Sequence, residues 1–143
     1  MKSFDRTYLI WALSYAAVGM ALGIYMGISG NHAQFITHAH IMLVGFVTSL
    51  IYAVIHRLWL PGPSRALATT QFVLHQAGSL VMLTGLLLMF GGAVAEEKMG
   101  PVMGLSTSAV ILGMLLMLVM VLKAGTKPAQ SVDTVDGRRT AAS

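Results

Sequence analysis

Four long runs of apolar residues, separated by short polar segments, occupy most of the chain. They cover approximately residues 7–28, 35–60, 67–92 and 99–122. Each run is long enough to cross a hydrocarbon core, which takes about 20 helical residues. The apolar residues are continuous and do not alternate with polar ones, which favours helices over the strands of a membrane barrel. The pattern therefore predicts an all-α integral membrane protein with four transmembrane helices in residues 1–125.

The composition agrees with this fold class. The chain of 143 residues is 56% hydrophobic and 10% charged, and its mean hydropathy is +0.76. A soluble domain of this size needs more charge on its surface. Residues 126–143 (TKPAQSVDTVDGRRTAAS) are polar and rich in small residues, and they predict a disordered cytoplasmic tail. Cysteine is absent, which excludes disulfides, thiolate metal sites and iron–sulfur clusters.

The positively charged residues are distributed unevenly between the two sides of the predicted helices. Of the 9 Lys and Arg residues, only Lys98 lies between the third and fourth runs; the others are Lys2, Arg6, Arg57, Arg65, Lys123, Lys127, Arg138 and Arg139. Because positive residues are retained in the cytoplasm, both termini are predicted to be cytoplasmic. We therefore expect a multi-pass protein of the bacterial inner (cytoplasmic) membrane, embedded in the lipid bilayer. The net charge of +4 reflects this topology, and no basic stripe indicates nucleic-acid binding.

None of the acidic residues lies inside an apolar run. They are Asp5, Glu96, Glu97, Asp133 and Asp136. Proton-coupled transporters usually need a carboxylate at membrane depth, and carboxylate-bridged metal pairs need several. The sequence therefore argues against both classes of protein.

Two histidines lie near the predicted outer end of the second helix, in the sequence QFITHAHIMLVGF (residues 34–46). Ionisable side chains are unfavourable in lipid, and inside membrane helices they usually mark a functional site. Residues two apart on a helix project about 200° apart, so His38 and His40 cannot close on one metal ion. Neutral imidazole binds heme iron, copper and zinc. We therefore predict that His38 and His40 serve two different sites, on opposite flanks of one helix.

Three further histidines and two methionines complete the set of possible ligands. His75 lies inside the third run, where it is either a cofactor ligand or a hydrogen-bonded packing residue. His32 and His56 lie at predicted membrane interfaces and need no functional explanation. Met42 and Met82 are the methionines best placed to bind copper or heme iron, although methionine in such helices is more often packing.

Glycines recur at helical spacings in all four runs. They include Gly19, Gly23, Gly27, Gly45, Gly78, Gly85, Gly100 and Gly104. Small residues on one face let membrane helices pack closely. The same faces would leave room for a flat macrocycle, and the two interpretations are compatible.

Residues 37–64 (THAHIMLVGFVTSLIYAVIHRLWLPGPS) resemble the ligand helices of subunit I of heme-copper oxidases and nitric oxide reductases. In that family, an H-x-H motif at the outer end of one helix binds a high-spin heme with its first histidine and a low-spin heme with its second. A second helix carries Ala-His, whose histidine is the other axial ligand of the low-spin heme. His38 and His40 match the first motif, and Ala39 with His40 matches the second.

This resemblance implies a noncovalent heme b, since the sequence has no CxxCH attachment motif. It implies electron transfer, or the binding and reduction of a diatomic gas, with a quinol or a cytochrome as electron donor. His40 would bind a low-spin heme and His38 a high-spin heme or another metal, such as copper. The family's His-His pair and histidine–tyrosine copper pattern are missing here, so oxygen reduction is not expected.

The resemblance also implies an oligomer. The family's twelve-helix subunit consists of three four-helix arcs around a pseudo-threefold axis, and this chain is similar to one arc. A homotrimer with hemes between neighbouring protomers would rebuild that architecture. Two alternatives remain open: a copper or other transition-metal protein using the same histidines, and a non-catalytic membrane scaffold or accessory subunit.

Overall fold

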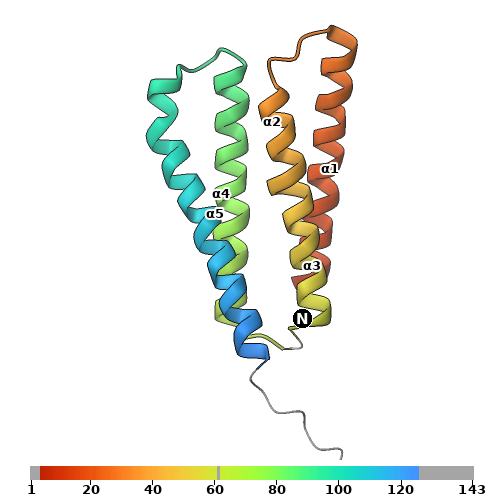
Figure 1. The fold of residues 1–143 in the computed structure, drawn as a ribbon, viewed down its shortest axis with the longest axis vertical. Coiled ribbons are helices and arrows are strands. Elements are labelled where there is room, and N and C mark those ends of the chain that lie inside the picture. Colours follow the sequence, from red (N-terminus) through yellow and green to blue (C-terminus); the bar gives the residue numbers. More distant parts are fainter. Residues whose placement is uncertain (1–3, 61, 126–143) are drawn as a thin grey trace, which may run out of the picture.

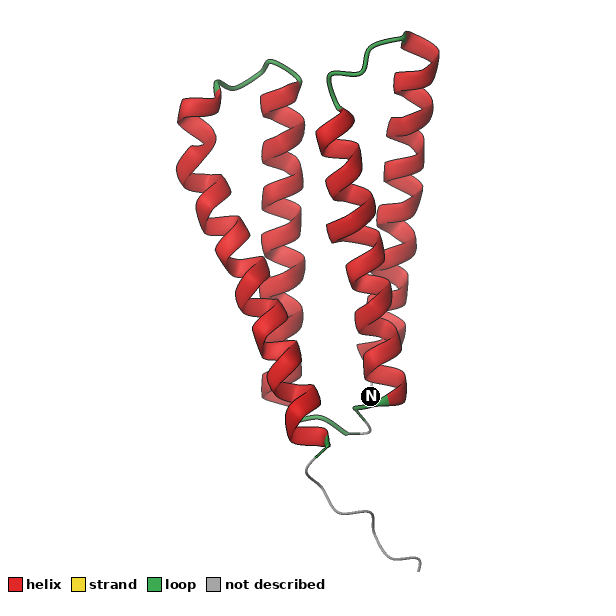
Figure 2. Ribbon diagram, in the orientation of Figure 1, coloured by secondary structure: helices red, strands yellow, loops and turns green. Residues whose placement is uncertain are grey.

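The computed structural model describes residues 4–60 and 62–125, and the regular structure in these residues is entirely helical (Figure 2). The elements are α1 (Phe4–Ser29), α2 (Phe35–His40), the π-helix η1 (Ile41–Val47), α3 (Thr48–Leu58), α4 (Arg65–Phe90) and α5 (Glu96–Ala124). α2, η1 and α3 follow one another without a break and form one segment. The predicted tail lies outside the described residues.

Four segments are long and apolar enough to cross a membrane. They are Phe4–Ser29, Phe35–Leu58, Arg65–Phe90 and Glu96–Ala124. The prediction of an all-α protein with four such helices is confirmed, and each boundary differs from the predicted one by at most three residues. The cytoplasmic location of the termini and the homotrimer stay predictions.

The segments form two antiparallel hairpins that lie side by side (Figure 1). α1 packs against α2, η1 and α3 in the first hairpin, and α4 packs along α5 in the second. The end where α1 begins and α5 ends carries Arg6, Arg57, Arg65 and Lys123, and we call it the basic end. Lys98, in the first turn of α5, lies at the opposite end.

Several of the predicted glycines lie at close helix contacts. A Cβ atom at Gly19 would approach the sulfur of Met42 to 2.6 Å, and one at Gly78 would approach the Ser106 carbonyl to 2.9 Å. Gly27, by contrast, has nothing within 4 Å of its Cβ position. Gly100 and Gly104 of α5 are equally open. The packing interpretation therefore holds for some of the predicted glycines in each hairpin, but not for all of them.

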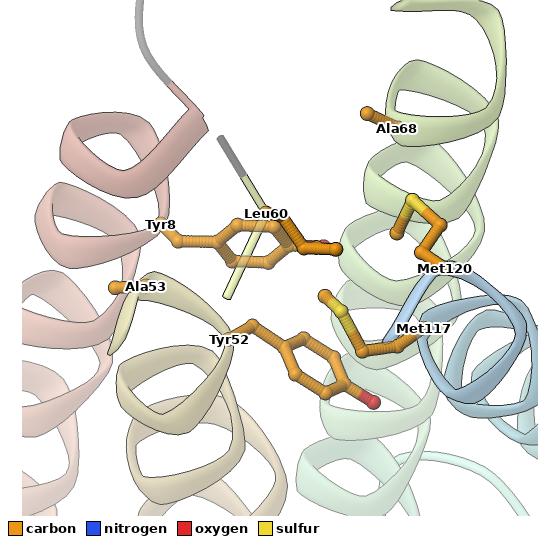
Figure 3. Packing of buried hydrophobic residues seen from close by; sticks show 7 residues of the cluster. All are labelled: Tyr8, Tyr52, Ala53, Leu60, Ala68, Met117 and Met120. Atoms are coloured by element: carbon orange, nitrogen blue, oxygen red, sulfur yellow. The ribbon is translucent and has the colours of Figure 1, made fainter. Parts of the chain in front are cut away.

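A core of buried side chains joins the two hairpins near the basic end (Figure 3). It consists of Tyr8, Tyr52, Ala53, Leu60, Ala68, Met117 and Met120. The tyrosine rings of α1 and α3 meet edge to face, with their centroids 5.5 Å apart. Fully burying large apolar side chains stabilises by roughly 1.5–3 kcal/mol each when the reference is water. In lipid this advantage is smaller, and close packing between helices carries more of the stability.

The π-helix η1 interrupts the second segment directly after His40. The hydroxyl of Thr48 donates to the Leu43 carbonyl over 2.9 Å, which satisfies one carbonyl in the altered hydrogen-bond pattern. Gly45, in the middle of η1, lies against the ring of Tyr15 from α1. π-helical turns are rare and are frequently found at functional sites. The sequence patterns do not predict this one.

Candidate functional site

The His38 side chain is fixed against α1. Its Nδ1 lies 2.9 Å from the carbonyl oxygen of Gly19. A carbonyl oxygen only accepts hydrogen bonds, so Nδ1 carries the hydrogen and donates it. Gly23 accommodates the ring, because a Cβ atom there would lie 3.1 Å from Cε1 of His38. The Nε2 atom of His38 is therefore left with its lone pair.

The His40 side chain is fixed in the same tautomer by a different partner. Its Nδ1 donates over 2.9 Å to the carbonyl of Ile36, one turn earlier on α2. The residue is half-buried. Nε2 makes no hydrogen bond to the described residues, so this ring also keeps a free acceptor atom.

The two imidazoles thus have separate anchors, one across the hairpin and one on their own helix. This is the arrangement expected for two ligands that serve different sites. Metal-bound histidines usually donate the hydrogen of their other ring nitrogen to a carbonyl or carboxylate, which fixes the tautomer and orients the ring. His38 and His40 both show this arrangement.

The donor set fits the axial ligation of a heme. Within residues 4–60 and 62–125, no three side chains of the types His, Cys, Asp and Glu converge. A heme needs no such cluster, because the porphyrin supplies four nitrogens and one or two imidazoles complete the coordination of the iron. His38 and His40 offer one Nε2 each.

His75 lies towards the middle of α4, beside the buried core. Its side chain is completely buried (0% exposed), and its ring centroid is 4.9 Å from that of Tyr52. Tyr52 follows His40 by 12 residues, which is about 18 Å along the segment. Val44, whose backbone also lies near the His75 ring, follows His40 by only four residues, or about 6 Å. The His75 ring therefore lies beside the segment between Val44 and Tyr52, further from its outer end than the H-x-H pair. Its ligation of a cofactor stays a prediction.

His75 was alternatively expected to be a hydrogen-bonded packing residue, and only the packing is observed. Neither ring nitrogen makes a hydrogen bond of acceptable geometry, although the backbone of Val44 lies near the ring. Gly113 lets α5 approach His75 closely, since a Cβ atom on residue 113 would lie 3.2 Å from the Cβ of His75. His75 is held by packing.

His32 and His56 were expected to need no functional explanation. His32 lies in the loop between α1 and α2, and its Nδ1 is 3.1 Å from the Gly30 carbonyl. His56 is 7% exposed and stacks between Phe4 and Tyr8, with ring centroids 5.4 and 5.6 Å away. It is a packing residue of the core.

A line of hydrogen-bonded polar side chains between the hairpins was missed by the sequence analysis. The hydroxyl of Tyr8 donates to Oε1 of Gln71 over 2.6 Å. Tyr15 donates to Oε1 of Gln76 over 3.0 Å, and Nε2 of Gln76 donates to Ser49 over 3.1 Å. We call these five residues the polar seam. A partial signal was present, since Gln71 and Gln76 are polar residues in an apolar run.

The chain matches no protein-family model, no curated protein and no solved structure. The likeness to heme-copper oxidases therefore rests on the H-x-H segment, and the interpretation of the site rests on its geometry.

Replacing Gln76 with leucine is expected to destabilise the contact between the hairpins by about 2–6 kcal/mol. The change removes two hydrogen bonds and leaves the hydroxyls of Tyr15 and Ser49 buried without a partner, at about 1–3 kcal/mol each. The measurement is the free energy of unfolding in mixed micelles, followed by helical circular dichroism. Thr84→Val, on an exposed position of the same helix, is the control. Equal stability of the two variants would show that the polar seam does not hold the hairpins together.

Proposed function

We propose that this protein binds heme b in the membrane, with His40 and His38 as axial ligands. The observation that carries the proposal is the shared state of the two rings, in which each Nδ1 donates to a backbone carbonyl over 2.9 Å. Each Nε2 is thereby kept as a ligand atom with a fixed orientation. The H-x-H motif supports the same assignment.

The different anchors suggest different roles for the two histidines. His40 is assigned to a low-spin heme, as in the resemblance, and His38 to a second heme or another metal. When bound, heme supplies one-electron transfer or, if one axial position stays open, binding of a diatomic gas. The chain itself holds the imidazoles in the ligating tautomer, through the carbonyls of Gly19 and Ile36. A quinol or a cytochrome is the proposed electron donor.

Purified protein from heme-replete cells is expected to show a b-type spectrum. The measurement is the reduced-minus-oxidised absorption difference, together with the iron and copper content per chain. We expect at least one heme per chain, extractable by acid acetone because it is noncovalent. A colourless preparation without iron would contradict the proposal. Copper without heme would instead support the transition-metal alternative, because the same Nε2 atoms suit that metal.

We also propose that the chain lies in the bacterial inner membrane with both termini in the cytoplasm, and that it assembles as a homotrimer. The support is the concentration of Lys and Arg at the basic end and the similarity of four helices to one arc of the larger subunit.

Native mass spectrometry in detergent is expected to give three times the 15.2 kDa chain mass plus heme. Removal of the heme is expected to shift the population toward monomer, since a ligand that binds only the assembled state stabilises it. A monomer that keeps its full heme content would overturn the trimer without affecting the heme assignment.

A further inference from the structure

A cavity of about 650 Å³ lies at the basic end, between the beginning of α4, the end of α5 and the connection that precedes α4. Its volume is within the range of roughly 300–1,000 Å³ that is typical of ligand sites. Leu60 and Met120, both 4% exposed, form part of its wall and belong to the buried core (Figure 3). The cavity is therefore backed by well-packed residues.

The remaining lining combines an apolar wall with a positively charged rim. Leu67 and Leu116 add apolar surface, and Ser64 and Thr70 contribute hydroxyl groups. Lys123 also lines the cavity, and none of the described lining residues is acidic.

The surrounding surface has the same sign of charge. Arg65 is exposed and lies between two lining residues, Ser64 and Ala66. The carboxylate of Asp5, on the other hairpin, pairs with Arg57 over 3.6 Å. The cavity thus faces the level at which lipid headgroups lie, with a positive rim and a hydrophobic interior.

We propose that this cavity binds one anionic phospholipid, with the phosphate at Lys123 and the glycerol and upper acyl chain against Leu67 and Met120. A neutral lipid or a quinone would gain the apolar contacts without the charge interaction. Inorganic phosphate would gain the charge interaction and leave the apolar wall uncovered. Basic pockets between membrane helices are suited to acidic headgroups for this reason. The proposal does not depend on heme binding.

The test exchanges the purified full chain into micelles containing equal amounts of dioleoylphosphatidylglycerol and dioleoylphosphatidylcholine, and counts retained lipids by native mass spectrometry. We expect one phosphatidylglycerol per chain, retained about fivefold over phosphatidylcholine. Lys123→Gln is expected to remove that preference. Ala66→Trp, which fills the cavity and keeps the charge, is expected to lower the retention of both lipids.

Lys98→Gln is the matched control, because it removes the same charge from the opposite end of the bundle. It is expected to leave the lipid count unchanged, and circular dichroism confirms that each variant is folded. The proposal is overturned if both lipids are retained equally, if Lys98→Gln has the effect of Lys123→Gln, or if Ala66→Trp has no effect. Displacement of the lipid by an added quinone or by inorganic phosphate at equal concentration would also overturn it.

Discussion

His40→Ala is expected to eliminate the low-spin heme signal and to leave the helical fold intact. The side chain is only half-buried and its single hydrogen bond is to its own helix, so its removal disturbs little packing. The iron would lose an axial imidazole. We expect heme occupancy to fall by more than about tenfold, since even the partners behind a ligand contribute 10–100-fold to metal affinity.

The measurement is the α-band of the reduced-minus-oxidised spectrum per milligram of folded protein. Imidazole added to the His40→Ala protein is expected to restore part of the band, which a purely structural defect would not allow. His32→Ala is the control, because it removes a histidine from an exposed loop. If His40→Ala retains the wild-type spectrum, the assignment of this ligand is wrong.

His38→Ala provides an internal comparison. Its ring lies against Gly19 and Gly23 on α1, on a different flank from the anchor of His40. Its loss is therefore expected to spare the low-spin band and to abolish carbon monoxide binding to a high-spin heme. If both variants lose the same band in the same proportion, the two histidines bind one heme and the two-site interpretation fails.

The number and type of elements could be predicted from the sequence because hydrophobic length alone determines membrane helices. A run of about 20 apolar residues has no other stable structure in lipid, where each backbone group must be hydrogen-bonded internally. Boundaries were less well determined. Helix α5 begins at Glu96, because a polar first turn can continue a helix beyond the apolar run.

The geometry of the candidate site could be predicted only in part. The separation of His38 from His40 follows from helical periodicity, which needs no knowledge of neighbouring helices. The hydrogen-bond partner of His38 depends on how α1 packs against α2. Gly19 could therefore not be identified from the sequence. The π-helix could not be predicted either, since no side-chain pattern distinguishes it from an α-helix.

The polar seam likewise could not be predicted in full, because the sequence does not identify the partners of its glutamines. Gln71 and Gln76 are visible as polar residues in an apolar run, but their partners lie on α1 and α3. A periodic pattern identifies a face of a helix and does not identify what that face contacts. Tyr15 donates to Gln76 across the two hairpins, a contact that its position in the first apolar run does not indicate.

Gly45→Leu is expected to be among the most destabilising single changes in the bundle. A Cβ atom at this position would lie 2.7 Å from Cγ of Tyr15 and 2.8 Å from Cδ1, inside the contact limit. The ring cannot simply swing away, because its hydroxyl is bonded to Gln76 in the other hairpin. The first hairpin would have to open at η1, and we expect a loss of about 3 kcal/mol, the upper end for overpacking.

The control for this change is Gly27→Leu, which introduces the same side chain into α1 where nothing lies within 4 Å. Leucine favours a helix over glycine, so the control is expected to be neutral or slightly more stable. Both variants are compared by the free energy of unfolding in mixed micelles. Tyr15→Ala combined with Gly45→Leu is expected to be less harmful than the sum of the two single changes, with a coupling of about 0.5–3 kcal/mol. Strict additivity would mean that Gly45 and Tyr15 do not meet, and the contact between η1 and α1 that supports the candidate site would then be wrong.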